Sequence, residues 1–120
     1  MKLTPKLLDG AFEYKTISTR DFAKIGGEIP QNTVAMIKES EAVTIIVPTD
    51  KTDGEIWAWI VNTNITSLTA TGITAAFSET LAKANIPCNV IAAYYHDHIL
   101  VPYSMKDKAV EILKNVEIQG

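Results

Sequence analysis

The chain has 120 residues, of which 47% are hydrophobic and 21% charged, and its formal net charge is −3. This length and composition predict one compact globular unit, or two small ones sharing a core, and exclude a disordered chain. Lys and Arg are scattered singly, so we expect no nucleic-acid partner. The chain has no apolar run long enough to span a membrane, no signal-peptide character in MKLTPKLLDG, and a single cysteine. We therefore expect a soluble, cytoplasmic protein without membrane contact.

The first half of the sequence predicts short elements. Thr4-Pro5 has the pattern of an N-cap followed by proline, which predicts one helical turn at the start of the chain. Apolar and polar residues alternate over Phe12–Ser18, as in a strand with one wetter face. A short helix is expected over 34–40, and the β-branched run Ala42–Val47 predicts a buried strand.

The second half predicts the order strand, helix, strand, strand, helix. The expected elements are a strand over Ile56–Asn62 with both tryptophans, a helix over 73–84, strands over Cys88–Tyr95 and Ile99–Tyr103, and an amphipathic helix from Ser104. The first helix has an apolar stripe through Ile73, Phe77 and Leu81. Asn85 suits the left-handed residue that ends such a helix.

This order of elements lacks only a final strand to complete the ferredoxin-like βαββαβ unit. Phe12–Ser18 or Ala42–Val47 could fill that place. The polar segment TDKTDGE is the best candidate for an internal boundary, which predicts a reduced N-terminal half over 1–55 and a C-terminal half over 56–120 within one compact unit. We therefore predict an α+β protein with a mostly antiparallel sheet and helices on one face.

The stretch AAYYHDHILVPY contains both histidines of the chain, on either side of Asp97. His96 and His98 could share a metal ion, but a stable zinc site needs three or four protein ligands and the spacing selects no third one. Acid–base catalysis would need a nucleophile and an orienting group, and no motif supplies them. The favoured interpretation is a hairpin with His96-Asp97 as its tight turn and Asp97 at positive φ. We expect no catalytic residue, no metal ion and no cofactor, and hence not an enzyme.

The loop between the predicted strand Ile56–Asn62 and the following helix is dense in polar side chains. These are Asn62, Thr63, Asn64, Thr66, Ser67, Thr69 and Thr71. Unsatisfied N–H groups at a helix N-terminus favour a carboxylate or another anion, and Gly72 would allow a ligand to come close. The same side chains could instead cap the helix and form turns, so the residues alone leave ligand binding and capping open.

Two stretches of the second half resemble the ACT-like family of small regulatory domains. They are ITAAFSETLAKANIPCNV, over 73–90, and AAYYHDHILVPY, over 92–103. The hairpin is most similar to that of a stand-alone bacterial branch, with Tyr-Tyr-His-Asp-His before an apolar strand and Val-Pro. Weaker likeness in LLDGAFEYKTIS and IKESEAVTIIVP extends the resemblance over nearly the whole chain. The resemblance implies two ferredoxin-like, ACT-like units in tandem, the first of them reduced, which pair into dimers.

ACT domains generally bind small ligands, often amino acids, between the loop and helix after the first strand and a neighbouring strand. The resemblance carries this site over to a loop side and a strand side. The loop side would be Asn64, Ile65, Thr66, Ser67 and Gly72, and the strand side would be Asn89, Val90 and Ile91. This chain departs from the family where many ACT domains have an Asp that meets the ligand's ammonium group, because its loop offers only amides and hydroxyls.

With the resemblance, the sequence predicts a regulatory domain that binds a small metabolite and acts as a homodimer. An amino acid is the first candidate for that metabolite. Because we expect no attached enzyme domain, any effect of the ligand would pass through a partner. The alternative is a protein–protein interaction or oligomerisation module without a small ligand. In that case the polar loop would only cap the helix.

Overall fold

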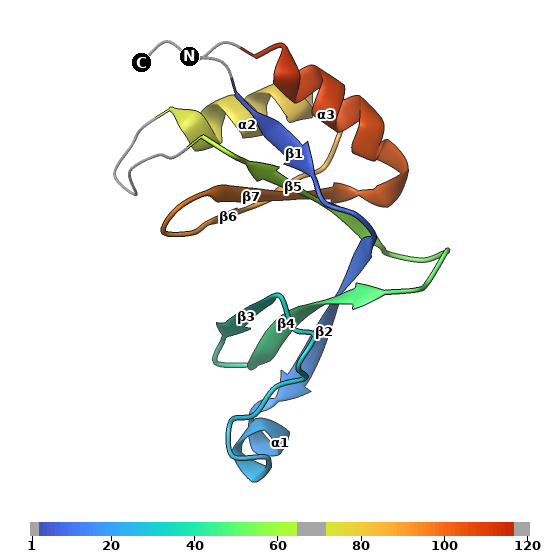
Figure 1. Ribbon diagram of the computed structural model, residues 1–120. Helices are drawn as coiled ribbons and strands as arrows, with labels where there is room; N and C mark the ends of the chain where they lie inside the picture. The colour runs from blue at the N-terminus through green and yellow to red at the C-terminus, as the bar shows by residue number, and fades with distance from the viewer. Residues whose placement is uncertain (1–2, 65–71, 117–120) are drawn as a thin grey trace. The chain divides into compact units, whose positions relative to one another are not determined.

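The computed structural model describes residues 3–64 and 72–116 and divides the chain into two compact units (Figure 1). The larger unit consists of residues 1–9 and 57–120, and the smaller unit consists of residues 10–56. The first nine residues, which the sequence assigned to the N-terminal half, thus belong with the second half of the chain.

In the described residues the larger unit is an antiparallel sheet with two α-helices on one face (Figure 1). The elements are β1 (Pro5–Leu7), β5 (Trp57–Asn62), α2 (Ile73–Lys83), β6 (Asn89–Ala92), β7 (Asp97–Pro102), the 3₁₀ turn η1 (Tyr103–Met105) and α3 (Lys106–Lys114). The strands lie in the order β1-β5-β7-β6, and each neighbouring pair is antiparallel. The predicted α+β, ferredoxin-like fold is confirmed.

Strand β1 supplies the strand that the second half of the sequence lacked. The helical turn predicted at Thr4-Pro5 is wrong, because Pro5 and Leu7 lie opposite Asn62 and Ile60 of β5. Proline has no N–H to donate, but this is tolerated at an edge strand. The extended conformation also brings Leu7 against the core. Neither Phe12–Ser18 nor Ala42–Val47 fills this place, since both belong to the smaller unit.

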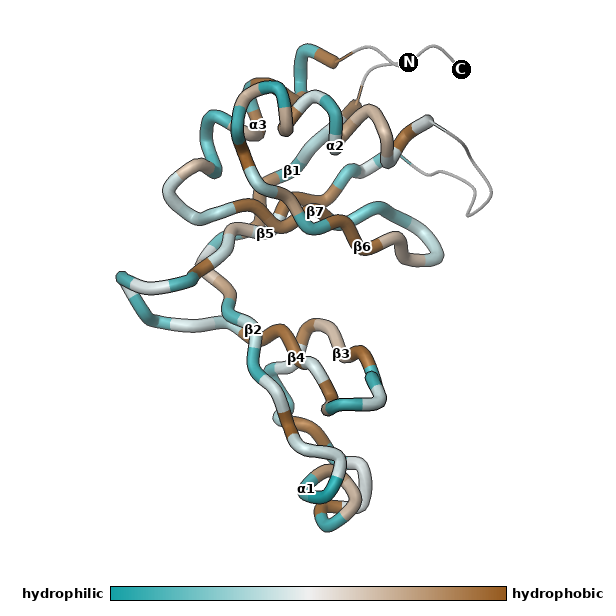
Figure 2. Tube along the Cα trace, turned by 180° about the vertical axis from the view of Figure 1, so that it is seen from behind, coloured by the Kyte–Doolittle hydropathy of each residue, from teal (hydrophilic) through white to brown (hydrophobic). Residues whose placement is uncertain are grey.

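The core of the larger unit lies between the sheet and the two helices. Ala58 and Ile60 of β5 point toward the helices and are 0% exposed. The predicted stripe of α2 is confirmed, as Ile73, Phe77 and Leu81 are all buried in the same cluster. Its remaining buried members are Leu3, Ile86, Ile99, Val101, Ala109 and Leu113. Figure 2 shows the same distribution along the chain, with hydrophobic stretches in β5 and β7.

Helix α2 ends at the predicted residue. Asn85 has φ 58°, the one positive φ of a non-glycine residue among the residues described. The Asn85 N–H donates to the Ala82 carbonyl at 3.0 Å, and the Ile86 N–H donates to the Leu81 carbonyl at 2.9 Å. These two bonds form a Schellman motif, which asparagine tolerates better than most residues with a Cβ.

The smaller unit is a three-stranded antiparallel sheet in the residues described, with one short helix. Its elements are β2 (Ala11–Ser18), α1 (Thr19–Lys24), β3 (Ala35–Lys38) and β4 (Ala42–Thr49), and the strands lie in the order β3-β4-β2. The helix predicted over 34–40 is wrong, because Ala35–Lys38 pairs with β4. A two-residue turn at Ser40-Glu41 closes this hairpin, with the Glu39 N–H donating to the Ala42 carbonyl. Pairing with a strand so close in the sequence outweighs the weak helix propensity of these residues.

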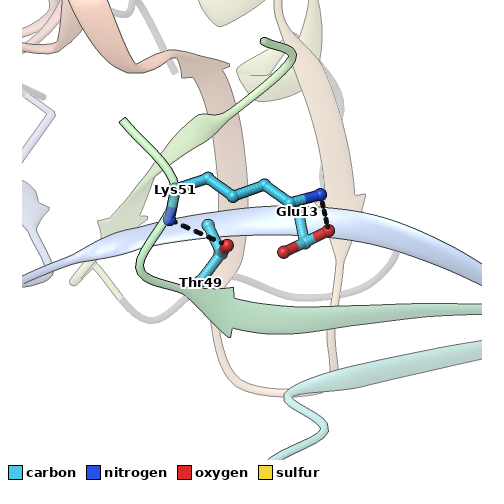
Figure 3. A network of polar contacts seen from close by, with 3 residues as sticks. All are labelled: Glu13, Thr49 and Lys51. Atoms are coloured by element: carbon cyan, nitrogen blue, oxygen red, sulfur yellow. Dashed lines mark hydrogen bonds and ion pairs between the residues drawn. The ribbon is translucent and has the colours of Figure 1, made fainter. Parts of the chain in front are cut away.

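A polar network fastens the segment that follows β4 onto β2 (Figure 3). The Lys51 ammonium lies 3.0 Å from Glu13 Oε1, and the Glu13 side chain is only 10% exposed. The Lys51 N–H donates to Thr49 Oγ1 at 3.2 Å. Hydrogen bonding from Thr49 and then from Lys51 lowers the pKa of the Glu13 carboxyl below its usual value.

Candidate functional site

The hairpin with both histidines is present, but its turn lies earlier than the sequence predicted. The Ala93 N–H donates to the His96 carbonyl at 3.1 Å, which places Tyr94 and Tyr95 in the turn. These two side chains are 72% and 65% exposed. Asp97 instead begins β7 and pairs with Ala92 of β6. The predicted His96-Asp97 turn is therefore wrong, because pairing with both neighbouring strands holds Asp97 in the sheet.

His98 is held by a neighbouring tryptophan. The Trp59 indole Nε1–H donates to His98 Nδ1 at 3.0 Å, and the two rings meet edge to face. Accepting at Nδ1 requires a neutral imidazole with its proton on Nε2. Burial lowers the pKa of His98 below its ordinary value, with a smaller contribution from His96. Among the described residues, no three His, Cys, Asp or Glu side chains gather closely enough to bind a metal ion.

Two buried polar residues lie side by side at one end of the sheet of the larger unit. Asn62 is the last residue of β5 and pairs in register with Asp97, the first residue of β7. Successive side chains alternate between the faces of a sheet, so both point to the same face as Ile60 and Ile99, the face that the helices cover. Asn62 is 0% exposed and Asp97 is 8% exposed.

The Asn62 amide is only half satisfied. Its Oδ1 accepts the Thr4 N–H at 3.1 Å, which ties it to the residue before β1. Its Nδ2 is buried and has no hydrogen-bond partner in the structure described. A buried donor without an acceptor costs about 1–3 kcal/mol, so such a group in a native protein calls for an explanation.

The N-terminus of α2 lies at the same end of this unit. Figures 1 and 2 both show α2 beginning beside the end of β5, and Ile73 packs in one cluster with Ile60 and Ile99. The N-cap is Gly72, with φ 86°, and it provides no side chain to accept from the first turn. No acidic residue lies in that turn. The N-cap residue therefore leaves the first N–H groups of α2 without the side-chain acceptor that usually caps a helix, in the part of the chain that the structure describes, and such groups favour an anion.

Two of the predicted loop-side residues lie within the part of the chain that the structure describes. Asn64 and Gly72 lie at the two ends of the loop, next to β5 and α2. Asn64 Oδ1 accepts both the N–H and the hydroxyl of Thr4, each at 3.0 Å, so this amide serves partly to hold β1. Ile65, Thr66 and Ser67 lie outside the described residues.

The predicted strand-side residues divide between the two faces of β6. Val90 pairs with Ile99 and packs against the core under the helices, on the face of Asn62. Asn89 and Ile91 alternate with it and point to the other face. The set carried over from the family resemblance left out Asn62 and Asp97, although Asn62 is one of the polar side chains that the sequence places before the helix. The signal for Asn62 is its even spacing from Ala58 and Ile60, but the partner strand of Asp97 follows only from the fold.

The comparisons with known proteins agree with this architecture. A family model described as an ACT domain matches residues 59–115. A protein of unknown function from Vibrio cholerae, described as a possible transport protein, is 30% identical over 95% of this chain and 88% of its own, with a TM-score of 0.77. A protein from Agrobacterium tumefaciens is 18% identical over 96% and 89%, with a TM-score of 0.73. The aspartokinase alpha and beta subunits give 12% identity over 92% and 95%, with a TM-score of 0.66.

The chain belongs to the ACT domain family, as the resemblance predicted. ACT domains are regulatory and often bind amino acids, and these matches indicate no catalytic family. The Agrobacterium protein and the aspartokinase, at their low identity, show the shared fold alone. No curated protein matches the chain. Within residues 3–64 and 72–116, no helix has the length and apolar character needed to cross a membrane.

Proposed function

We propose that this protein is a regulatory ACT domain that binds a small metabolite, with an amino acid as the first candidate. The binding site lies where β5 ends beneath the first turn of α2. The observation that carries the proposal is the buried Asn62 Nδ2, which has no acceptor among residues 3–64 and 72–116, beside a helix whose N-cap, Gly72, provides no side-chain acceptor. Both groups are donors. A carboxylate satisfies several donors at once and complements the partial positive charge of the helix N-terminus.

Several residues inferred from the family resemblance lie next to the end of β5 or the start of α2. Asn64 and Gly72 flank it on the loop side, and Val90 lies on the same face of the sheet. Ile65, Thr66, Ser67, Asn89 and Ile91 complete the proposed ligand-binding set.

A homodimer in the cytoplasm is part of the same proposal. ACT domains often pair, and ligand binding then changes how the paired units meet a regulated partner. We also propose that the smaller unit is a reduced copy of the larger. The elements β2, α1, β3, β4 and the elements β5, α2, β6, β7 run in the same order, and the third strand lies between the other two in both.

The test is thermal and urea unfolding of the protein with each of the twenty amino acids and with common organic acids. A ligand at one hundred times its Kd should add about 2.7 kcal/mol to the free energy of unfolding. Asn62→Asp keeps the oxygen that accepts from Thr4 and replaces the free donor with an oxygen that repels a carboxylate. We expect this variant to bind at least about tenfold more weakly.

Asn115→Asp is the matched control, because Asn115 is an exposed residue at the end of α3 that donates to the Glu111 carbonyl. It makes the same chemical change in the same unit away from the site, and it should bind like the wild type. Equal ligand stabilisation of Asn62→Asp and the wild type would contradict the placement of the site. No stabilisation by any compound would contradict ligand binding itself.

The second candidate function is an interaction module without a small ligand, and the edge strand β3 favours it. Met36 and Ile37 are 39% and 47% exposed, and β3 ends the strand order of its sheet. Exposed apolar edge strands pair readily with another chain. In this case Ile37→Lys would dissociate dimers in sedimentation experiments, while no amino acid would change the stability of the wild type.

A further inference from the structure

The residue that precedes β1 determines how the Asn62 amide is oriented. The Thr4 N–H donates to Asn62 Oδ1 at 3.1 Å, and it also donates to Asn64 Oδ1 at 3.0 Å. Because a backbone N–H can only donate, the Asn62 amide turns its oxygen toward Thr4. The other end of the planar amide, Nδ2, is then left without a partner in the part of the chain that the structure describes. Thr4 therefore fixes which end of the Asn62 amide is available to a ligand.

Strand β1 also covers Asn62. Pro5 lies directly opposite Asn62 in the register of β1 and β5, and residues in direct opposition project to the same face of a sheet. This is the face beneath the helices, where Leu7 packs against the core. Asn62 is 0% exposed with β1 in this position. Release of β1 from β5 would expose the amide to water along this edge.

Strand β1 is a short edge strand, and short edge strands open locally at a low cost in free energy. It has three residues, and Pro5 contributes no N–H. Two of the backbone bonds that hold it lie just beyond its ends. The Thr63 N–H donates to the Thr4 carbonyl and the Leu8 N–H donates to the Trp59 carbonyl, both at 2.9 Å. These two N–H groups report directly whether β1 is docked.

We propose that β1 is a strap whose docking against β5 regulates the ligand site, so that a docked β1 and a bound carboxylate or other anion stabilise each other. The inference rests on the proposed site at Asn62 and adds the regulation of that site. With β1 docked, Asn62 presents its donor to the anion. With β1 released, the amide is hydrated and free to rotate its oxygen toward the anion, which weakens binding. Such coupling is reciprocal, so the anion favours docking by the same factor by which docking favours the anion.

The first test is amide hydrogen exchange of the wild type, followed by NMR at the Thr63 and Leu8 N–H groups. The probes are the twenty amino acids, acetate, lactate and malate. A probe that raises thermal stability should slow exchange at both groups at least about tenfold when it is present at one hundred times its Kd. The Glu39 N–H is the control, because it donates to the Ala42 carbonyl within the β3–β4 hairpin of the smaller unit, and its exchange should not change.

The second test weakens the docking of β1 without altering Asn62. Leu7 and Met105 are both half-buried against the same core cluster, but Met105 lies in η1, beyond the end of β7 that is opposite Asp97. In calorimetric titration with the same probe, Leu7→Ala should bind about 3- to 10-fold more weakly than the wild type, as expected if the docked population falls to between a third and a tenth. Met105→Ala, the matched control, should bind within about twofold of the wild type.

The results separate this inference from the proposed function. If a probe raises thermal stability but leaves exchange at Thr63 and Leu8 unchanged, the strap is overturned and ligand binding stands. Equal affinities of Leu7→Ala and Met105→Ala for the probe would overturn the strap too. If no probe stabilises the wild type, both the inference and the proposed function fail. The exchange measurement needs no variant, so it decides the question even if Leu7→Ala folds poorly.

Discussion

The two units run through the same order of strand, helix, strand and strand, yet only one of them builds a deep core. In the larger unit, α2 buries Ile73, Phe77 and Leu81 against the sheet. In the smaller unit, the six residues of α1 include no buried side chain. The buried cluster against which Phe22 of α1 packs is limited to Val43, Ile45 and Val47, with a few half-buried neighbours. Helix α1 has six residues and α2 has eleven, so α1 makes fewer than two turns and presents a shorter apolar face to its sheet.

The two units also differ in how the N-terminus of the helix is capped. Ser18 caps α1, with its Oγ accepting the Asp21 N–H at 3.0 Å. Helix α2 begins at Gly72 without a side-chain cap and without an acidic residue in its first turn. The unit with the larger core thus has the helix whose N-cap residue provides no side-chain acceptor. Natural proteins give up local stability of this kind at functional sites.

The largest expected effect tests the difference between the cores. Phe77 is 0% exposed and packs among residues of both helices and the sheet, so Phe77→Ala should lower the free energy of unfolding by about 3–5 kcal/mol. Phe22 is only half-buried in the smaller unit, and Phe22→Ala should cost less than about 2 kcal/mol. Urea unfolding measures both, and equal losses would contradict the contrast between the units.

The helix starts are tested next. Gly72 has φ 86°, and a Cβ there would meet no atom within 4 Å, so only backbone strain opposes Gly72→Ala. We expect a loss of about 1–2 kcal/mol and partial recovery in Gly72→Asn. Ser18→Ala removes the cap of α1 and should cost about 1 kcal/mol. Chemical unfolding of the three variants would contradict this account if Gly72→Ala were as stable as the wild type.

A smaller expected effect is the loss of stability of the larger unit as the pH falls. Because the folded pKa of His98 is below its ordinary value of about 6.5, the unfolded chain takes up the proton first. The stabilisation is fully present above about pH 6.5 and is lost as the pH falls from there through the folded pKa. Tryptophan fluorescence should report the change, since Trp59 donates to His98. His98→Gln should remove this pH dependence and His96→Gln should retain most of it, which unfolding between pH 5 and 7.5 can check.

The smallest expected effect is the loss of stability of the smaller unit as the pH falls. The pKa of Glu13 is lowered from 4.5, so its contribution is present above about pH 4.5 and is lost as the pH falls through the folded pKa. Glu13→Gln should be less stable than the wild type at pH 7 and equally stable at low pH. The exposed pair Glu79–Lys83 is the control, and Glu79→Gln should cost no more than about 0.5 kcal/mol. Identical acid unfolding curves for wild type and Glu13→Gln would show that the network contributes nothing.

Much of the fold could be predicted from local patterns. The stripe through Ile73, Phe77 and Leu81 and the left-handed Asn85 follow from helix period and C-cap chemistry, which need no knowledge of distant residues. Local rules failed where a strand took its conformation from a partner. The Thr4-Pro5 start became an edge strand beside β5, and the helix expected over 34–40 became β3 beside β4.

The candidate site could be predicted only in part. The polar loop before α2 left an anion site and simple helix capping as alternatives, because helix N-termini favour anions wherever they occur. The pairing of Asn62 with Asp97 could not be read from the sequence, since a strand register depends on every contact along both strands. The sequence by itself determined the helices, the alternating strands and the family likeness, through short-range periodicity. Only the tertiary structure decided that β1 completes the sheet and that a buried amide and a buried carboxylate meet under α2, because both require residues far apart in the chain to pair.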